Sequence, residues 1–327
     1  MRRFVAVTLP VRLASGVIVG LVALAAPAHA QSAPPPGTWS QKAPMPGVRG
    51  EVAAAIVGNK LYALGGVVNR SAVARNEEYD PATDRWRPRA PLPQPRDHLG
   101  VAVVNGKIYT FGGFTSAVHQ GAGDVVFEYD PVGDVWRTLT PMKGPRASVG
   151  VAVIGGKIHV IGGRGLPAVT GTTHEVFDPA TGHWSEAAPL PRARDHMATV
   201  AVDGKMHVIG GRLGERTEHT GQHDIYDPAT NSWSSGPPLP TPRSGVAGTF
   251  YKGMTLVLGG ELPPTHMFVE NEDYDPKTGR WVTLAPMPAG RHGFGAGVVG
   301  QDLYAVGGSL TPGGPGNTDQ LIMFRLP

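Results

Sequence analysis

The stretch "HVIGGR" (His207–Arg212) joins a short apolar run to two glycines and an arginine. Adjacent glycines are costly inside a regular element, because each loses backbone entropy on folding and neither packs a side chain. The pair therefore indicates a strand end where φ is positive or where a neighbouring segment comes close. Because the same pair recurs along the chain, it belongs to a repeat.

The repeat is marked by three residue types at matching intervals. Gly-Gly pairs recur every 47 to 50 residues, at Gly65–Gly66, Gly112–Gly113, Gly162–Gly163, Gly210–Gly211, Gly259–Gly260 and Gly307–Gly308. The tryptophans keep this spacing: Trp39, Trp86, Trp136, Trp184, Trp233 and Trp281. An arginine follows each tryptophan by ten residues: Arg49, Arg96, Arg146, Arg194, Arg243 and Arg291. Self-similarity at a fixed period of this length indicates a repeat architecture.

Each repeat reads as four short strands. In one copy these are "VAVV" (Val101–Val104), "IYTFGG" (Ile108–Gly113), a strand ending in "EYDP" (Glu128–Pro131), and a strand opened by Trp136. The first is continuously apolar, which is typical of a strand buried on both faces. A single four-stranded sheet cannot bury both faces alone, so the repeats must pack against one another. Radial packing also protects the strand edges, and a six-bladed, all-β propeller is predicted.

The two ends of the chain carry the two parts of one repeat. "GTWSQKAPMP" (Gly37–Pro46) contains the tryptophan strand with no blade before it. "DQLIMFRLP" (Asp319–Pro327) supplies a third strand and ends without a tryptophan. We therefore expect the N-terminal strand to complete the last blade from outside and to close the ring. The propeller is expected to span residues 38–327.

This pattern resembles the kelch repeat: Gly-Gly after the second strand, Tyr-Asp-Pro before a turn, and tryptophan six residues after the aspartate. The resemblance implies a six-bladed kelch-type β-propeller with four antiparallel strands per blade. It also implies that the loops after the second strand and before the first open onto one face. Most kelch propellers bind ligands or proteins, so a binding module is the first expectation. A fold alone does not decide function, however.

Two kelch-like enzyme families offer an alternative. The chain distantly resembles exported bacterial sialic-acid mutarotases, in which a glutamate and an arginine near the channel mouth are implicated. Glu261 follows the second strand of its blade, and Arg212 or Arg164 could supply the arginine. Galactose oxidase has a similar propeller, but its copper radical site needs a cysteine–tyrosine crosslink. This chain has no cysteine, so that chemistry is not expected.

The first thirty residues are typical of a secretory signal peptide. A basic start precedes the apolar run Leu13–Pro27, which is short for a membrane span, and the small-x-small cleavage site Ala28–Ala30. An uncleaved membrane anchor is the alternative. Residues 31–37 would then be a linker. The protein is expected to be exported to the periplasm or the medium, with no membrane span after cleavage.

Charge and composition exclude some partners. The whole chain carries a net charge of +3, and the signal contributes three arginines and no acid, so the remainder is neutral. A neutral domain gives no reason to expect nucleic-acid binding. The expected partner is a glycan, a sugar acid or an exported or envelope protein. No cofactor is expected, and a monomer is predicted.

Residues that recur in every blade are expected to be structural. The glycine pairs should end strands, and the tryptophans should pack between blades. Acids two positions before the aromatic residue of the third strand recur with the arginines: Glu77, Glu175, Asp224 and Glu272. Charge-assisted hydrogen bonds between these acids and the periodic arginines are predicted.

Function is expected where the blades differ. Directly after Gly-Gly stand Val67, Phe114, Arg164, Arg212, Glu261 and Ser309. Two residues past the periodic arginine stand Glu51, His98, Ser148, His196, Gly245 and Gly293. Both sets should surround the channel mouth, and the predicted ligand-binding residues are Arg164, Arg212, Glu261, His98, His196, Glu51 and Phe114. Arginines beside imidazoles suit a carboxylate, a phosphate or a sulfated sugar. The alternative is a solvated polar rim without a ligand.

Acid–base chemistry on a sugar needs one acid and one base near the ring oxygen, and Glu261 with His196 are the catalytic candidates. The tripeptide "RDH" occurs twice, at Arg96–His98 and Arg194–His196. It can indicate a metal or acid–base site. The preferred interpretation is a repeat variant in which the aspartates bond nearby backbone, with no metal site.

Overall fold

A computed structural model of the chain describes Met1 and residues 35–116, 119–165, 169–214, 218–314 and 316–327. The chain divides into two units, Met1–Pro34 and Pro35–Pro327. The expected signal peptide beyond Met1, and residues 31–34 of the expected linker, lie outside the described residues. The Pro36 carbonyl accepts a hydrogen bond from the Ala285 amide at 2.9 Å. Among the described residues, no helix is long and apolar enough to cross a membrane.

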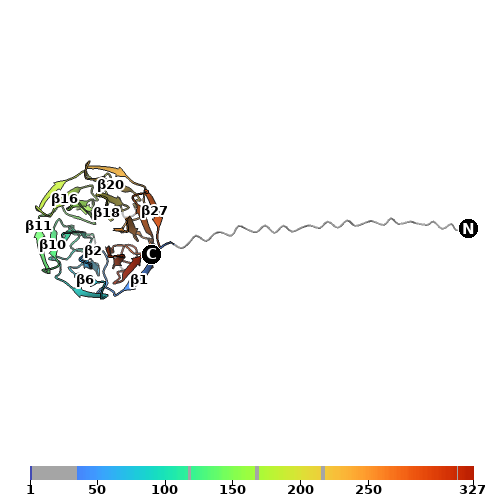
Figure 1. Cartoon of the computed structure of the whole chain (residues 1–327), viewed down its shortest axis with the longest axis horizontal. Coiled ribbons are helices and arrows are strands. Elements are labelled where there is room, and N and C mark those ends of the chain that lie inside the picture. The colour runs from blue at the N-terminus through green and yellow to red at the C-terminus, as the bar shows by residue number, and fades with distance from the viewer. Residues whose placement is uncertain (2–34, 117–118, 166–168, 215–217, 315) are drawn as a thin grey trace. The chain divides into compact units, whose positions relative to one another are not determined.

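The second unit is an all-β ring of six four-stranded antiparallel sheets, so the predicted fold is confirmed (Figure 1). Blades 1 to 3 are β2 (Ala53–Val57), β3 (Lys60–Leu64), β6 (Asn76–Asp80) and β7 (Arg85–Pro88); β8 (Gly100–Val104), β9 (Lys107–Phe111), β10 (Val126–Asp130) and β11 (Val135–Leu139); and β13 (Gly150–Ile154), β14 (Lys157–Ile161), β16 (His174–Asp178) and β17 (His183–Glu186).

Blades 4 to 6 are β18 (Ala198–Val202), β19 (Lys205–Ile209), β20 (His223–Asp227) and β21 (Ser232–Ser235); β22 (Ala247–Tyr251), β23 (Met254–Leu258), β26 (Asn271–Asp275) and β27 (Arg280–Thr283); and β28 (Gly295–Val299), β29 (Asp302–Val306), β30 (Leu321–Arg325) and β1 (Thr38–Lys42). Short two-stranded extensions are β4 (Val67–Val68) with β5 (Ser71–Ala72), β12 (Arg146–Ala147) with β15 (Arg164–Gly165), and β24 (Glu261–Leu262) with β25 (His266–Met267).

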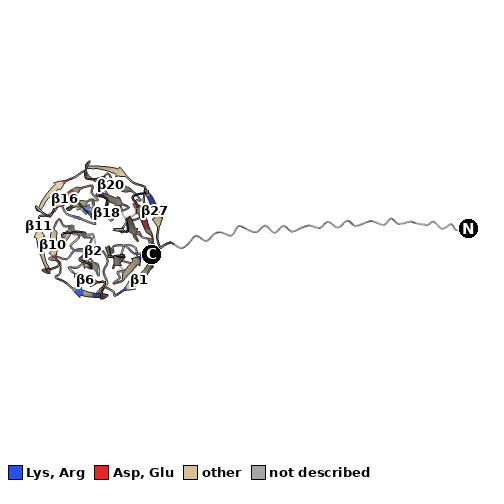
Figure 2. Cartoon of the chain, viewed as in Figure 1, with Lys and Arg blue, Asp and Glu red and all other residues tan. Residues whose placement is uncertain are grey.

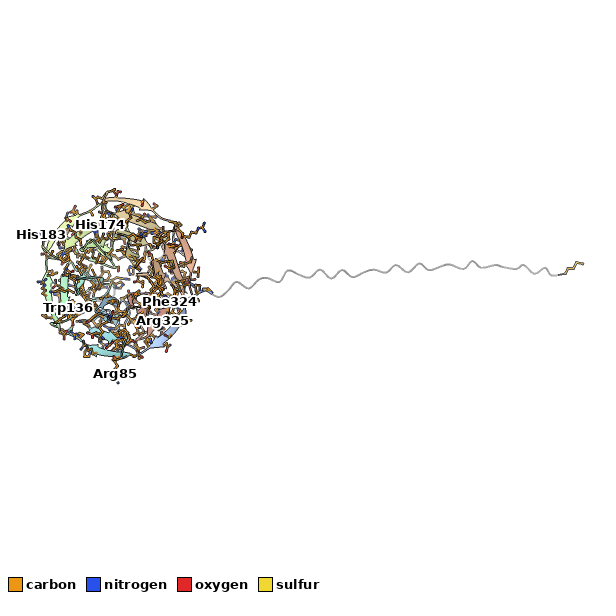
Figure 3. All side chains as sticks on the ribbon, in the orientation of Figure 1. Arg85, Trp136, His174, His183, Phe324 and Arg325 are labelled. Atoms are coloured by element: carbon orange, nitrogen blue, oxygen red, sulfur yellow. The ribbon has the colours of Figure 1, made fainter. Side chains whose placement is uncertain are left out.

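Blade 6 is built from both ends of the folded chain, as predicted. Strand β1 pairs antiparallel with β30, with Thr38 opposite Arg325 and Trp39 opposite Phe324. The Trp39 and Phe324 rings lie 4.9 Å apart between centroids. Figure 3 labels Phe324 and Arg325 at this outer edge. Closing the ring in this way gives blade 6 its fourth strand, so each of the six blades has four strands.

The glycine pairs join each blade to the next. The second glycine amide donates to the carbonyl of the next periodic arginine: Gly66 to Arg96, Gly113 to Arg146, Gly163 to Arg194, Gly211 to Arg243, Gly260 to Arg291 and Gly308 to Arg49. At the first glycine there is no room for a side chain. A Cβ added to Gly112, which has a φ of +62°, would lie 2.0 Å from the Arg146 carbonyl oxygen. The positive φ and the close approach of the neighbouring blade's backbone therefore both require glycine at this position.

The tryptophans join the outer strands to the preceding blade. Each indole Nε1 donates to a carbonyl of that blade; in blade 2, Trp136 donates to Ala90 at 2.8 Å. The Trp136 ring, labelled in Figure 3, lies 4.7 Å from Tyr129 between centroids. Tyr62 and Ile108 belong to the same apolar cluster, which fills the space between blades 1 and 2. Burial between blades, not within one, makes the repeat cooperative.

The periodic arginines and acids are paired inside the blades. The pairs are Arg49–Glu77, Arg146–Glu175, Arg194–Asp224 and Arg243–Glu272. All are buried, which suits a guanidinium that also donates to backbone carbonyls. Blades 2 and 6 have no acid at this position, and there Arg96 and Arg291 donate to Gln94 and Gln320. Figure 2 shows basic and acidic residues in several blades, among many uncharged ones.

Candidate functional site

Six chain segments meet at the axis of the ring through the residue two past the periodic arginine. All six have a positive φ between 50° and 67°: Glu51, His98, Ser148, His196, Gly245 and Gly293. Each amide from His98 to Gly293 donates to the carbonyl of the preceding member, and the Val52 amide closes the circle onto the Gly293 carbonyl. The left-handed conformation costs a non-glycine residue roughly 1–3 kcal/mol. Four side chains are therefore held at the axis against a local preference.

A cavity of about 530 Å³ opens on this face of the propeller. Among its lining residues are Glu51, His196, Arg212, Glu261 and His292, together with loop residues of several blades. A smaller hollow of about 120 Å³ shares Glu51 and His196 with it and adds His98. The larger volume lies in the range of small-molecule sites.

One hydrogen-bonded group in the cavity wall is centred on Asp195, which is fully buried. Its Oδ1 lies 2.5 Å from His196 Nδ1 and accepts from Arg212 Nε at 3.0 Å, and its Oδ2 accepts from Thr170 at 2.7 Å. Burial raises the pKa of Asp195, but the neighbouring cations and donors outweigh burial and lower it strongly. Burial and the Arg212 charge lower the pKa of His196 to about 4, so this imidazole is neutral at pH 7.

A second group is centred on Glu51. Its oxygens lie 3.2 Å from His98 Nε2 and 3.4 Å from His292 Nε2. His292 Nδ1 lies 3.2 Å from Glu261 Oε2, which also accepts from the Gly313 amide at 2.8 Å. Burial lowers the pKa of His292, but the hydrogen bond and charge of Glu51, with the charge of Glu261, outweigh it and the pKa rises. The pKa of Glu51 falls well below its ordinary value because the two imidazoles outweigh burial.

The structure brings most of the sequence-predicted site residues to the cavity. Glu51, His196, Arg212 and Glu261 line it, and His98 lines the smaller hollow. Phe114 is a correction, because it is 1% exposed and packs on Ala122 and Ala147 beside the His98 ring. The Phe114 side chain therefore lies within the blade and not in the opening.

Arg164 is a second correction. It does not line the cavity, because its guanidinium donates to the Gly214 carbonyl at 2.9 Å and lies 3.7 Å from Asp195. Arg212 does line the cavity, but it is 2% exposed and its charge is balanced by Asp195. The expected pair of free cations is therefore not present at the mouth.

The catalytic candidates also need correction. His196 contacts Asp195, Arg212 and Ser148, while the imidazole beside Glu261 is His292. The aspartates of the two "RDH" tripeptides bond side chains, not the backbone: Asp97 lies 2.5 Å from His98 Nδ1, as Asp195 does from His196.

Sequence reasoning missed His292, and a signal for it existed. The residue directly after the periodic arginine varies between blades, and it pairs with the residue after Gly-Gly, as His292 does with Ser309. The loop residues His119, Asn69 and Asn317 were also missed. They lie in segments whose length differs between blades, so the repeat carries no signal for them.

One group of three residues can hold a metal ion, among the residues that the structure describes. Ring nitrogens of His98, His119 and His196 all lie within 4.8 Å of one another. The ring centroids are 4.9 to 5.7 Å apart.

Comparison with known proteins identifies the repeat. The family model described as the KLHDC2/KLHL20/DRC7 Kelch-repeats domain matches residues 145–308, and the Kelch motif matches residues 49–93 and 95–143. None of the curated proteins compared with the chain matches it. A solved structure entitled "Structure of YjhT" is similar, with a TM-score of 0.72 and 19% identity over 86% of this chain and 98% of that one.

Proposed function

The chain belongs to the kelch-repeat family, and we propose that its central cavity binds a small polyhydroxy ligand of monosaccharide size. One observation carries this proposal: polar side chains from different blades line one cavity of about 530 Å³ and are already held by hydrogen bonds. Groups fixed before the ligand arrives lose little conformational freedom on binding. Hydroxyl groups, which donate and accept, match a wall of carboxylates, imidazoles and guanidinium.

The charge balance favours a sugar over a strongly anionic ligand. Glu51 and Glu261 line the cavity together with Arg70 and Arg212. Arg212 already contacts Asp195, so the described part of the wall offers no excess of positive charge. A phosphate or sulfate would lie near two carboxylates, and like charges repel strongly at low dielectric. We therefore expect neutral sugars or singly charged sugar acids to bind in preference to sulfated or phosphorylated ones.

A thermal-shift screen of the untagged protein tests this function. The panel contains glucose, galactose, N-acetylglucosamine, sialic acid and glucose 6-phosphate, each at millimolar concentration with chelator present. We expect at least one of the first four to raise the Tm, and the shift to fall sharply in Glu261→Gln and Glu51→Gln. The matched control is Glu186→Gln, an exposed glutamate on an outer strand. The proposal is wrong if no sugar raises the Tm, or if both cavity variants respond like the control.

A sugar mutarotase is the second candidate, favoured by the contact between Glu261 and His292. Opening the ring moves one proton from the anomeric hydroxyl to the ring oxygen, while the bond between the anomeric carbon and the ring oxygen breaks and a carbonyl forms at the anomeric carbon. Glu261 would take the first proton, and His292, whose pKa is raised by Glu51 and Glu261, would give the second. The 3.2 Å between His292 Nδ1 and Glu261 Oε2 lets the proton return, so the pair is regenerated.

NMR of freshly dissolved α-glucose and α-sialic acid distinguishes the two functions. A mutarotase would exchange the anomers faster than buffer does, and Glu261→Gln and His292→Gln would each lose most of the acceleration. If the exchange rate equals that in buffer while a sugar still raises the Tm, the catalytic candidate is removed and the binding function stands.

We also propose that the protein is exported, because its first thirty residues have the composition of a cleaved signal. Mass spectrometry of the protein recovered from cells would find a mature N-terminus after Ala30. Recovery of the intact N-terminus on the chain would overturn this proposal.

A further inference from the structure

We propose that His98, His119 and His196 form a binding site for one divalent transition-metal ion such as Zn²⁺, at the axial end of the central cavity. This inference goes beyond the proposed sugar binding and does not depend on it. It begins from the convergence of three imidazoles whose ring nitrogens all lie within 4.8 Å of one another. Two come from equivalent positions of blades 2 and 4, and the third comes from a loop of blade 2.

The backbone directs all three rings toward one point. His98, His119 and His196 have φ values of 53°, 63° and 56°, in the left-handed region that only a few per cent of non-glycine residues occupy. Between the two axial histidines, blade 3 contributes Ser148, whose small side chain leaves room for both rings. Its Oγ lies 3.3 Å from His196 Nε2. At His98 and His196 this conformation recurs at the equivalent position of every blade, so it places the two rings at the axis without being particular to them.

Carboxylates hold two of the rings as they do in metal sites. Asp97 and Asp195 are fully buried, and each lies 2.5 Å from the Nδ1 of the histidine that follows it. A carboxylate on one ring nitrogen fixes the tautomer and turns the other nitrogen toward a metal ion. That arrangement leaves Nε2 as the ligand atom of both His98 and His196.

His98 Nε2 has a charged neighbour, Glu51, but no hydrogen bond among the described residues. It is buried and makes no hydrogen bond within the described part of the chain, although Glu51 Oε2 lies 3.2 Å away. A buried polar atom without a hydrogen bond is costly, commonly by about 1–3 kcal/mol. A bound metal ion would remove this cost. The alternative interpretation, a solvated rim of histidines, does not explain why the protein bears it.

The charges around the rings suit a divalent cation. Asp97, Asp195 and Glu51 contact them, and Arg212 is the one guanidinium that does so among the described residues. Counting only the side chains that contact the rings, three carboxylates stand against one guanidinium. Arg212 Nη2 lies 2.9 Å and 3.2 Å from the two nitrogens of His196, so this guanidinium must shift when Nε2 binds the ion.

The donor set selects the metal class. Imidazole nitrogens suit Zn²⁺, Cu²⁺, Ni²⁺ and Co²⁺, whereas Mg²⁺ and Ca²⁺ prefer oxygen ligands. Bonds of about 2.0–2.1 Å in tetrahedral geometry put the nitrogens about 3.3 Å apart, so the rings must close by up to about 1.5 Å on the ion. Because His119 and His196 line the cavity, the fourth position would face it and accept water or a ligand oxygen.

Titration of the metal-free, untagged chain with Zn²⁺ by calorimetry tests this site. We expect one saturable site per chain, with micromolar or tighter affinity, and Co²⁺ should give the visible absorption of a tetrahedral nitrogen site. His119→Ala should weaken binding at least tenfold, and Asp97→Ala should weaken it about 10- to 100-fold, as loss of a supporting carboxylate does. The matched control is His266→Ala, which removes an exposed histidine from the corresponding loop of blade 5.

The proposal is overturned if Zn²⁺ does not saturate one site, or if His119→Ala binds Zn²⁺ as tightly as His266→Ala does. Circular dichroism establishes that each variant is folded. If Asp97→Ala does not fold, the comparison of His119→Ala with its control decides alone. No sugar is present in the titration, and the sugar screen contains chelator, so failure of one proposal leaves the other intact.

Discussion

Asp273, on β26, is the least satisfied carboxylate that the structure describes, and we predict that replacing it stabilises the protein. It is fully buried, and neither carboxylate oxygen has a hydrogen-bond partner among the described residues. At the same place, Glu78 of blade 1 accepts from Tyr62 and Arg87, whereas blades 3 and 4 carry Val176 and Ile225. Blade 5 therefore has the acid without its partners.

The magnitude follows from proton linkage. Burial, with a smaller effect of the Asp275 charge, raises the pKa of Asp273 from 3.8 to about 8. Between these values the folded state binds more protons than the unfolded state, so stability falls as the pH rises. The slope is up to ~1.36 kcal/mol per pH unit. From pH 4 to pH 7 the loss therefore reaches about 4 kcal/mol at most.

Urea unfolding of wild type and Asp273→Asn at pH values from 4.5 to 8 measures this effect. Asparagine keeps the shape of the protonated acid without the titration, so the two proteins should be similarly stable at pH 4.5. At pH 7 the variant should be more stable by several kcal/mol. The control is Asp227→Asn, a half-buried aspartate at the end of β20 whose pKa is lowered mainly by its hydrogen bond to Lys205. A pH-independent difference, or a variant less stable at pH 7, would refute the reasoning.

Two further predictions concern the packing between blades. Burial lowers the pKa of His174 (Figure 3) and of His223 to about 4, so the folded state binds fewer protons than the unfolded state and stability falls as the pH drops from 6.5 to 4. In the double variant His174→Asn and His223→Asn, the Tm should fall less between pH 7 and pH 4.5 than it does in wild type. Asparagine suits these positions because Asn76 of blade 1 already makes the equivalent hydrogen bond to a carbonyl. The same fall in Tm for both proteins would contradict this prediction. Gly112→Ala should lower the free energy of unfolding by about 3 kcal/mol or more, because positive φ and a backbone clash add. Gly106→Ala, with positive φ but open space, should cost only about 1 kcal/mol, and equal losses in urea unfolding would show that the clash is unimportant.

Much of the fold was predictable because its determinants are local and repeated. The Gly-Gly pairs, the tryptophans and the arginines each occupy one equivalent position per blade, and the same contact is made six times. A departure from the pattern in one repeat does not change the predicted fold, because the other five repeats carry the same pattern. Closure by β1 was also predictable, since the two ends of the chain carry complementary parts of one repeat.

The site was only partly predictable, because its residues are those that do not repeat. The position in the repeat correctly predicted that Glu51, Arg212 and Glu261 lie at the cavity. The same reasoning was wrong for Phe114, which is buried in the blade. The variable position of His292 could have placed it near the axis, but only the structure shows that it lies beside Glu261, since this contact spans two blades.

By itself, the sequence determined that the chain folds as a closed ring of six blades, and which two positions of each blade vary near the axis. Only the tertiary structure decided which variable side chains share a cavity, which ion pairs neutralise them and which loop adds His119. The reason is physical: strand pairing follows from local periodicity, whereas side-chain direction at the axis depends on the left-handed backbone of residues such as His98 and on contacts between blades.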